Sequence, residues 1–169
     1  MGRARGGIGV ASGRGGLTAV TSPPPPSTNP DTQPFWDACA RHELRLQRCD
    51  ACSTFRFYPG PMCPSCGSFE HEWVQVTGRG EVYSYVIVRR AASSAFNGEV
   101  PYATALVELE GAGGIRLPAR IVDCPVDDVA IEMAVEVVFE TASEGFTVPV
   151  FRPVAGSAGD EARVNRSAG

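Results

Sequence analysis

Four cysteines in two closely spaced pairs are the residues whose types and spacing could do chemistry. Cys49 and Cys52 form one Cys-x-x-Cys pair, and Cys63 and Cys66 form a second pair after ten intervening residues. Each pair places two sulfurs on one side of a tight turn, so two pairs supply the four thiolates of a tetrahedral metal site. Zn²⁺ suits this set because it is borderline soft and has no geometric preference of its own. The spacing therefore predicts one bound zinc ion.

The predicted metal site is closed. Four cysteine ligands leave no position for water or substrate, so we expect the zinc to be structural. Gly67 directly follows the second pair, where a left-handed backbone costs glycine little. A rubredoxin-type iron held by the same sulfurs would instead carry electrons, and this alternative stays open. Two disulfides would suit a small secreted domain, but no signal peptide is recognisable.

Composition and charge are typical of one globular domain or two small ones. The chain has 169 residues, is 43% hydrophobic and 20% charged, and carries a formal net charge of −4. An acidic chain is a poor default partner for nucleic acid, because affinity for nucleic acid comes mostly from neutralised phosphates. No apolar run approaches the roughly 18 residues that a membrane span requires. With reduced cysteines and no targeting segment, these features predict a cytoplasmic protein.

The order of elements predicts a mainly β fold in three parts between two tails. Thr32 can cap a helix that has Pro34 in its first turn. After the cysteines, apolar residues alternate with a period of two, and several short strands without a long helix indicate a five-stranded OB-fold barrel. The predicted parts are a disordered tail (1–31), a docking helix (32–43), a zinc ribbon (44–72), the barrel (73–153) and a second disordered tail (154–169). The predicted barrel strands are 73–76, 81–88, 102–109, 115–122 and 134–139, with 148–151 either extending the last strand or crossing back.

Several short motifs accompany this order of helix, ribbon and barrel. They are Pro34-Phe-Trp, Leu46-Gln-Arg-Cys-x-x-Cys52, Tyr58-Pro59 before Cys63-Pro-x-Cys-Gly67, Glu72-Trp73, Gly78-Arg-Gly80, Val82-Tyr-Ser-Tyr85, Pro101-Tyr102, Val137-Val-Phe139 and Phe151-Arg-Pro153. Between about Pro34 and Pro153 the chain therefore resembles a family of acyl-CoA-associated OB-fold proteins with an N-terminal rubredoxin-like zinc ribbon, long catalogued as a domain of unknown function.

The resemblance implies a non-catalytic accessory subunit. Members of the family accompany thiolase-like enzymes, including thiolases and aldolases of steroid side-chain degradation, acyltransferases of the thiolase superfamily, and MaoC-type hydratases. They are thought to hold the acyl-CoA or to complete the active site of the partner. The expected partner is thus a thiolase-like enzyme subunit in a hetero-oligomer, with acyl-CoA as a possible ligand. Lipid or steroid metabolism and acyl transfer are the expected settings.

Two groups of residues are candidates for binding. Arginine can grip phosphate through two parallel hydrogen bonds, so Arg89 and Arg90, with the nearby Phe96, are candidates for contact with coenzyme A, and Arg79 is a second candidate. The alternative is that these arginines are solvated. Phe35 and Trp36 on the helix could anchor the partner, because aromatic residues dominate interface energetics. The alternative is that the helix docks on its own domain.

The sequence offers little chemistry of its own. His42 and His71 are expected at the surface, and Cys39 and Cys124 are expected to be small buried apolar residues rather than nucleophiles. No nucleophile elbow or P-loop is present. We therefore expect no enzyme activity from this chain alone. The alternative functions are a single-stranded nucleic-acid-binding OB-fold protein, which would need a basic groove with stacking aromatics, and the iron electron carrier.

Overall fold

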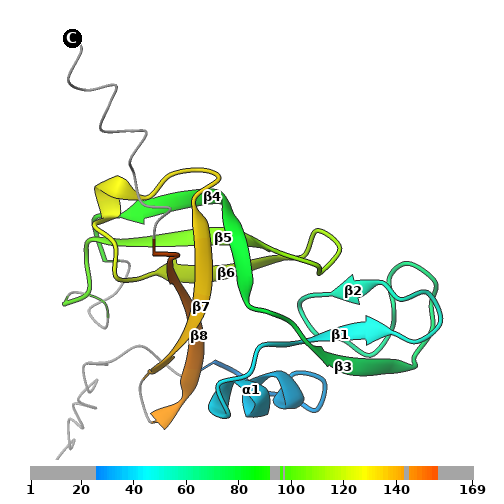
Figure 1. Cartoon of the computed structure of the whole chain (residues 1–169). Coiled ribbons are helices and arrows are strands. Elements are labelled where there is room, and N and C mark those ends of the chain that lie inside the picture. Colours follow the sequence, from blue (N-terminus) through cyan, green and yellow to red (C-terminus); the bar gives the residue numbers. More distant parts are fainter. Residues whose placement is uncertain (1–25, 92–95, 97, 143–144, 156–169) are drawn as a thin grey trace, which may run out of the picture.

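The computed structural model contains one α-helix and two sheets among the residues that it describes (Figure 1). It describes residues 26–91, 96, 98–142 and 145–155. The elements are α1 (Gln33–Ala40), β1 (Arg45–Cys49), β2 (Phe55–Arg56), β3 (His71–Gln75), β4 (Arg79–Val88), β5 (Tyr102–Leu109), β6 (Arg116–Ile121), the short 3₁₀ helix η2 (Val126–Asp128), β7 (Ala134–Thr141) and β8 (Thr147–Pro153). The tails predicted to be disordered fall largely outside the described residues.

Five strands close the barrel in the order β4-β5-β6-β8-β7, which confirms the OB-fold prediction. Alternate residues of β5 face the interior, as the period of two requires. All pairings are antiparallel except β6 with β8, which run parallel and are in register at one pair, Ile121 with Phe151. Strand β8 is therefore a separate strand that crosses back beside β7 and closes the barrel against β6.

The ribbon is a three-stranded sheet in the order β2-β1-β3. Residues 73–76 are predicted to form a barrel strand, but β3 pairs with β1 over five residue pairs, from Arg45 with Gln75 to Cys49 with His71. The physical reason is that β1 and β2 share only two registered pairs, and an isolated two-stranded hairpin is marginal in water. The third strand completes the ribbon sheet, so the fifth barrel strand is β8.

Helix α1 is shorter than the predicted range 32–43. Pro34 lies in the first turn as expected. The Thr32 side chain makes no capping hydrogen bond to the helix, and its Oγ1 instead accepts the N–H of Asn29 at 3.0 Å. The helix ends at Ala40, and His42 follows with a φ of 60°. A left-handed residue at this point turns the chain into β1.

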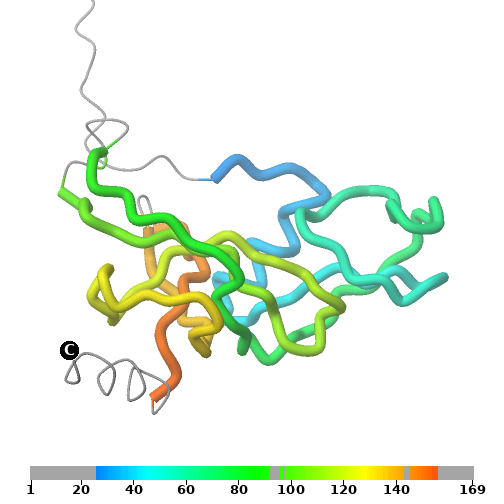
Figure 2. The backbone as a smooth tube through the Cα atoms, turned by 90° about the horizontal axis from the view of Figure 1, so that it is seen from above, coloured from blue at the N-terminus to red at the C-terminus, as the bar shows by residue number. Residues whose placement is uncertain are grey.

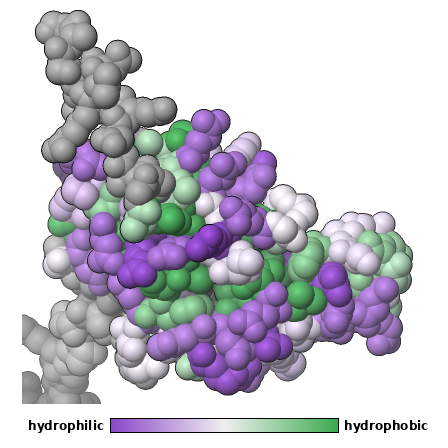
Figure 3. Space-filling model, in the orientation of Figure 1, coloured by the Kyte–Doolittle hydropathy of each residue, from purple (hydrophilic) through white to green (hydrophobic). Residues whose placement is uncertain are grey.

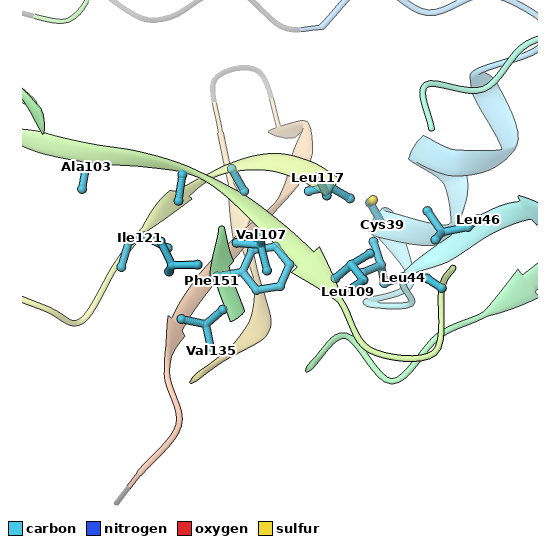
Figure 4. Packing of buried hydrophobic residues seen from close by; sticks show 14 of the residues in the cluster. Cys39, Leu44, Leu46, Ala103, Val107, Leu109, Leu117, Ile121, Val135 and Phe151 are labelled. Carbon is cyan, nitrogen blue, oxygen red and sulfur yellow. The ribbon is translucent and has the colours of Figure 1, made fainter. Parts of the chain in front are cut away.

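A single hydrophobic core joins the three parts. Figure 4 shows Phe151 among the inward-facing residues of the barrel, with Cys39 and Leu44 beside Leu109. Helix α1 packs against both β8 and β1. In Figures 1 and 2 the rest of the ribbon extends to one side of the barrel. The helix and the base of the ribbon are thus fixed to the barrel by burial, while the cysteine pairs lie away from it.

Candidate functional site

The four cysteines of the sequence prediction meet at the end of the ribbon. Their sulfur atoms all lie within 4.8 Å of one another, and the Sγ atoms of Cys49 and Cys66, and of Cys52 and Cys63, are 3.6 Å apart. Tetrahedral coordination with Zn–S bonds of about 2.3 Å requires sulfurs about 3.8 Å apart. The four residues therefore fit a tetrahedral metal ion.

The two cysteine pairs have the same backbone hydrogen bonds. The N–H of Ser53 donates to the Cys49 carbonyl at 2.8 Å, and the N–H of Gly67 donates to the Cys63 carbonyl at 2.9 Å. The N–H groups of the two cysteines in turn donate to the carbonyls of Thr54 and Ser68. Each turn is closed by its own backbone hydrogen bonds, which help to hold the sulfurs in position.

Hydrogen bonds and neighbouring sulfurs shift the pKa values of Cys52 and Cys66 in opposite directions. Thr54, first through its side chain and then through its backbone, lowers the pKa of Cys52 to about 6. At Cys66 the backbone N–H of Ser68 also lowers the pKa, but the sulfurs of Cys52 and Cys49 outweigh it and raise the pKa to about 12. Four thiolates repel one another at this spacing, so a bound dication is what allows all four to ionise.

Ser53 and Gly67 each directly follow one Cys-x-x-Cys pair, but a left-handed backbone costs serine more free energy than it costs glycine. Both are left-handed, with φ of 57° and 77°, a conformation that only glycine adopts freely. We expect Ser53→Gly to raise the free energy of unfolding by about 0.5–1 kcal/mol and Gly67→Ala to lower it by about 1 kcal/mol. Urea unfolding of the metal-loaded chain measures both.

Gly60→Ala is the control for this pair of variants. Nothing lies within 4 Å of a Cβ at Gly60 or at Gly67, and Gly60 has no positive φ. A loss at Gly60 as large as that at Gly67 would mean that the cost is not conformational.

Buried polar side chains support the ribbon beneath the cysteines. Gln47 is 1% exposed, and its Oε1 accepts the N–H of Gly60 at 3.0 Å. His71 has Nδ1 3.1 Å from the Phe69 carbonyl and Nε2 3.1 Å from Gln47 Nε2. We assign the proton to Nδ1, because Gln47 Nε2 can only donate. His71 is thus fixed in the ribbon by hydrogen bonds on both ring nitrogens.

The predicted coenzyme-binding arginines do not form one site. Arg79 begins the ten-residue strand β4 and Arg89 directly follows it, so the two lie about 30 Å apart at about 3.3 Å per residue. Arg89 forms a solvent-exposed ion pair with Asp127 at 2.5 Å. Arg90 is exposed, and Phe96 is half-buried. Phosphate binding by Arg89, Arg90 and Phe96 stays a prediction, separate from any role of Arg79.

The two aromatic residues of the helix have different surroundings. Phe35 is 1% exposed and belongs to the core of this chain, which corrects the prediction that it anchors a partner. Its ring packs against Trp36 and Phe57, with centroids 4.9 and 5.5 Å away. Trp36 is half-buried and also packs against Phe146. The helix docks on its own domain through Phe35, and a partner contact of Trp36 stays a prediction.

A second candidate site, which we call the junction groove, lies where the helix, the ribbon and the barrel meet. Its cavity of about 250 Å³ is lined mainly by apolar side chains. The lining residues include Phe35 and Trp36 from α1, Phe57 after β2, Leu117 and the charged Arg120 from β6, and Pro149 from β8. No sequence motif indicates this groove, because its walls come from segments far apart in the chain.

Cys39 and Cys124, which lie outside the four-cysteine cluster, show no sign of reactivity. Burial raises the pKa of Cys39 to about 12, and burial together with the charge of Asp128 raises the pKa of Cys124. A raised thiol pKa disfavours the nucleophilic thiolate. No helix of the described residues is both long enough and apolar enough to cross a membrane.

Comparisons with known proteins agree with this architecture. Residues 36–72 match the family model described as "ChsH2, rubredoxin-like zinc ribbon domain", and residues 73–140 match "ChsH2, C-terminal OB-fold domain". A solved structure described as "Ltp2-ChsH2(DUF35) aldolase" is 41% identical with a TM-score of 0.69, and the match covers 76% of this chain and 98% of that chain.

Two relatives carry different names. A "Probable enoyl-CoA hydratase alpha subunit" of Thermomonospora curvata is 42% identical over 77% of this chain, but the chain spans only 40% of its length. A "DUF35 domain-containing scaffold protein" of Methanocaldococcus jannaschii is 40% identical, with 57% of this chain and 67% of that protein covered. The resemblance inferred from sequence is thereby confirmed. With its ribbon, its barrel and this pattern of similarity, the chain belongs to the DUF35 family of ChsH2-type zinc-ribbon and OB-fold proteins.

Proposed function

We propose that this chain is a non-catalytic accessory subunit. In this proposal it binds a thiolase-superfamily enzyme, such as a thiolase, aldolase or acyltransferase, and helps to hold acyl-CoA or to complete the active site. The observation that carries the proposal is the closed four-cysteine cluster in a ribbon that is joined to an OB barrel. Such a site supplies folding energy but no open coordination position for substrate. Zinc is the proposed ion, because it suits four thiolates and the matching family model is a zinc ribbon.

Exposed apolar side chains on both the ribbon and the barrel support the proposal that the chain binds a protein partner. On the ribbon, Tyr58, Met62 and Phe69 are 50–67% exposed, and on the barrel Tyr83 and Val86 are 48% and 61% exposed. Figure 3 shows hydrophobic side chains reaching the surface over the barrel and at the far end of the ribbon. Large apolar side chains exposed on a surface can mark an interaction site. The solved relative that is named as an aldolase together with ChsH2(DUF35) supports the same class of partner.

Co-expression with a thiolase-like enzyme that is encoded by a neighbouring gene tests the proposal. We expect the two chains to elute together in size-exclusion chromatography, with about one zinc ion per copy of this chain, because one four-thiolate site binds one ion. Elution of this chain as a monomer that does not bind the enzyme would contradict the proposal. An oligonucleotide that binds in a salt-dependent way would favour the nucleic-acid alternative, and iron in the eluted protein would favour the electron carrier.

Two double variants test whether the ribbon or the barrel contacts the enzyme. Tyr58→Ser with Phe69→Ser removes apolar surface from the ribbon, and Tyr83→Ser with Val86→Ser removes it from the barrel. We expect one pair to weaken co-elution at least tenfold and the other pair to serve as its control. Equal, full assembly by both would show that neither apolar surface carries the contact.

A further inference from the structure

The four cysteines of the metal site differ in their exposure to solvent. Cys49 and Cys63 are each 1% exposed, whereas Cys52 and Cys66 are exposed. The exposed residues are the second members of the two Cys-x-x-Cys pairs. A chelator, a competing metal ion or another reagent in solution therefore meets Cys52 and Cys66 first. We call these two residues the exposed edge of the metal site.

The two residues of the exposed edge lie in closely matched turns. Thr54 is the second residue after Cys52, and Ser68 is the second residue after Cys66. The carbonyls of Thr54 and Ser68 accept the N–H of the first cysteine of each pair, at 3.0 and 2.8 Å. The backbone N–H of Thr54 also hydrogen-bonds to the Cys52 sulfur, and that of Ser68 to the Cys66 sulfur. The two exposed sulfurs thus have equivalent backbone donors.

The side-chain hydroxyls of the two turns make different contacts. Oγ1 of Thr54 lies 3.2 Å from Sγ of Cys52. Oγ of Ser68 instead accepts the backbone N–H of Glu70 at 3.1 Å. Within the described residues, the only side chains that are hydrogen-bonded to the Cys66 sulfur are the other cysteines. One hydroxyl contact is therefore the difference between two sulfurs that have the same kind of turn.

The hydrogen bond at Cys52 has a defined direction when a metal is bound. A cysteine that coordinates a metal is a thiolate, which accepts hydrogen bonds and has no proton to donate. The hydroxyl of Thr54 is then the donor, and Sγ of Cys52 is the acceptor. Four thiolates at this spacing repel one another, and a donor to one of them reduces this repulsion. Cys52 therefore has a stabilising contact that Cys66 lacks.

From these observations we infer that Thr54 is a positioning residue of the metal site. Its hydroxyl holds the Cys52 sulfur in place as a ligand, and metal exchange begins at Cys66, the exposed ligand without such a donor. The exposed edge is then the route by which the ribbon gains or loses its ion. The inference applies to zinc or to another ion that four thiolates bind, and it does not depend on the enzyme partner.

The rate of zinc release from the full-length chain measures this effect. The zinc-loaded protein is mixed with an excess of pyridylazoresorcinol, a chelator whose absorbance reports bound zinc. Thr54→Val keeps the branched shape but removes the hydroxyl, and we expect about fivefold faster release, as for the loss of one hydrogen bond. Thr54→Ser keeps the hydroxyl and should release zinc at the original rate. Ser68→Ala is the matched control in the second turn and should change the rate by less than about twofold.

Cobalt in place of zinc separates the hydrogen bond from a general loss of stability. Co²⁺ bound by thiolates has a sulfur-to-metal charge-transfer band in the near ultraviolet, and a hydrogen bond to a sulfur lowers the energy of the electrons on that sulfur. Loss of the bond in Thr54→Val should therefore move the band to longer wavelength, while Thr54→Ser and Ser68→Ala should leave it in place. A variant that only destabilised the ribbon would lose cobalt without moving the band.

The order in which the cysteines react tests the exposed edge with Thr54 intact, so it stays decisive if Thr54→Val fails to bind metal. The zinc-loaded chain carries Cys124→Ser, which removes a partly exposed thiol outside the site. It is treated with limiting N-ethylmaleimide, and the modified peptides are identified by mass spectrometry. We expect Cys66 to be modified before the other three ligands. In Thr54→Val, Cys52 should react at a rate close to that of Cys66.

Three results would overturn the inference: equal rates of zinc release from Thr54→Val and the unaltered chain, the same cobalt band shift in Ser68→Ala as in Thr54→Val, or modification of Cys52 before Cys66. Assembly with the enzyme is a separate measurement. A chain that assembles normally but gives any of these results would refute the role of Thr54 and leave the proposed function standing. A chain with the expected metal exchange that never assembles would do the reverse.

Discussion

Replacing Cys49 by serine is expected to abolish metal binding and unfold the ribbon. Structural zinc sites contribute about 10–16 kcal/mol of apparent binding free energy at neutral pH, and the ribbon sheet is small. Cys49 is 1% exposed, so its replacement also places a hydroxyl in a buried position. Metal analysis should show zinc falling from about one ion per chain to almost none, and the fluorescence of Trp73 on β3, measured in a Trp36→Phe background, should shift toward that of an exposed indole.

Cys124→Ser is the matched control for this variant. Cys124 is a half-buried free thiol outside the four-cysteine cluster, so its replacement should preserve both the zinc content and the Trp73 signal. In co-expression, Cys49→Ser should also lose the partner enzyme. A Cys49→Ser protein that stays folded and supports full activity of the complex would show that the metal has no structural role.

Replacing Gly80 by alanine is expected to lower the free energy of unfolding by about 3 kcal/mol, at the upper end of what overpacking usually costs. Gly80 is paired with Leu109 of β5 and with Val135 of β7. A Cβ at this position would lie 2.3 Å from the carbonyl oxygen of Glu108. Because that oxygen belongs to the backbone, it can move only if strand β5 moves away from β4. Denaturant unfolding followed by circular dichroism measures the loss.

Gly60→Ala again supplies the comparison, since its Cβ would meet nothing within 4 Å. It should change the free energy of unfolding by less than about 0.5 kcal/mol, as is usual for surface substitutions. A loss below about 1 kcal/mol at Gly80 would mean that the strands separate there with little cost, and that the close approach is not a constraint on the barrel.

The metal site and most strands could be predicted from local sequence. The spacing of two Cys-x-x-Cys pairs determines which sulfurs can meet, because each pair is held by its own turn. Strand β5 has the predicted limits, from Tyr102 to Leu109, because alternating apolar residues specify a strand and its buried face at once. Strand β4 begins at Arg79, earlier than predicted. Gly80 suggests a turn in sequence, but the neighbouring strands require a residue without a side chain there.

Pairing between distant segments could not be read in the same way. The segment at 73–76 has the alternation of a strand, but alternation does not name the neighbour. Its place beside β1 instead of in the barrel follows from the five registered pairs between the two strands. The same holds for β8, which pairs with β7 and reaches β6 at a single position. A strand pattern is local, whereas register depends on which other strands are available.

The sequence by itself identified the four cysteines that cluster in the ribbon, the family resemblance and the mainly β fold. Only the tertiary structure decided that Phe35 is a core residue and that a groove lies between the helix, the ribbon and the barrel. The physical reason is range. The sulfurs of each Cys-x-x-Cys pair are brought together by residues a few positions apart, while burial and cavities arise from packing between elements that are far apart in the sequence.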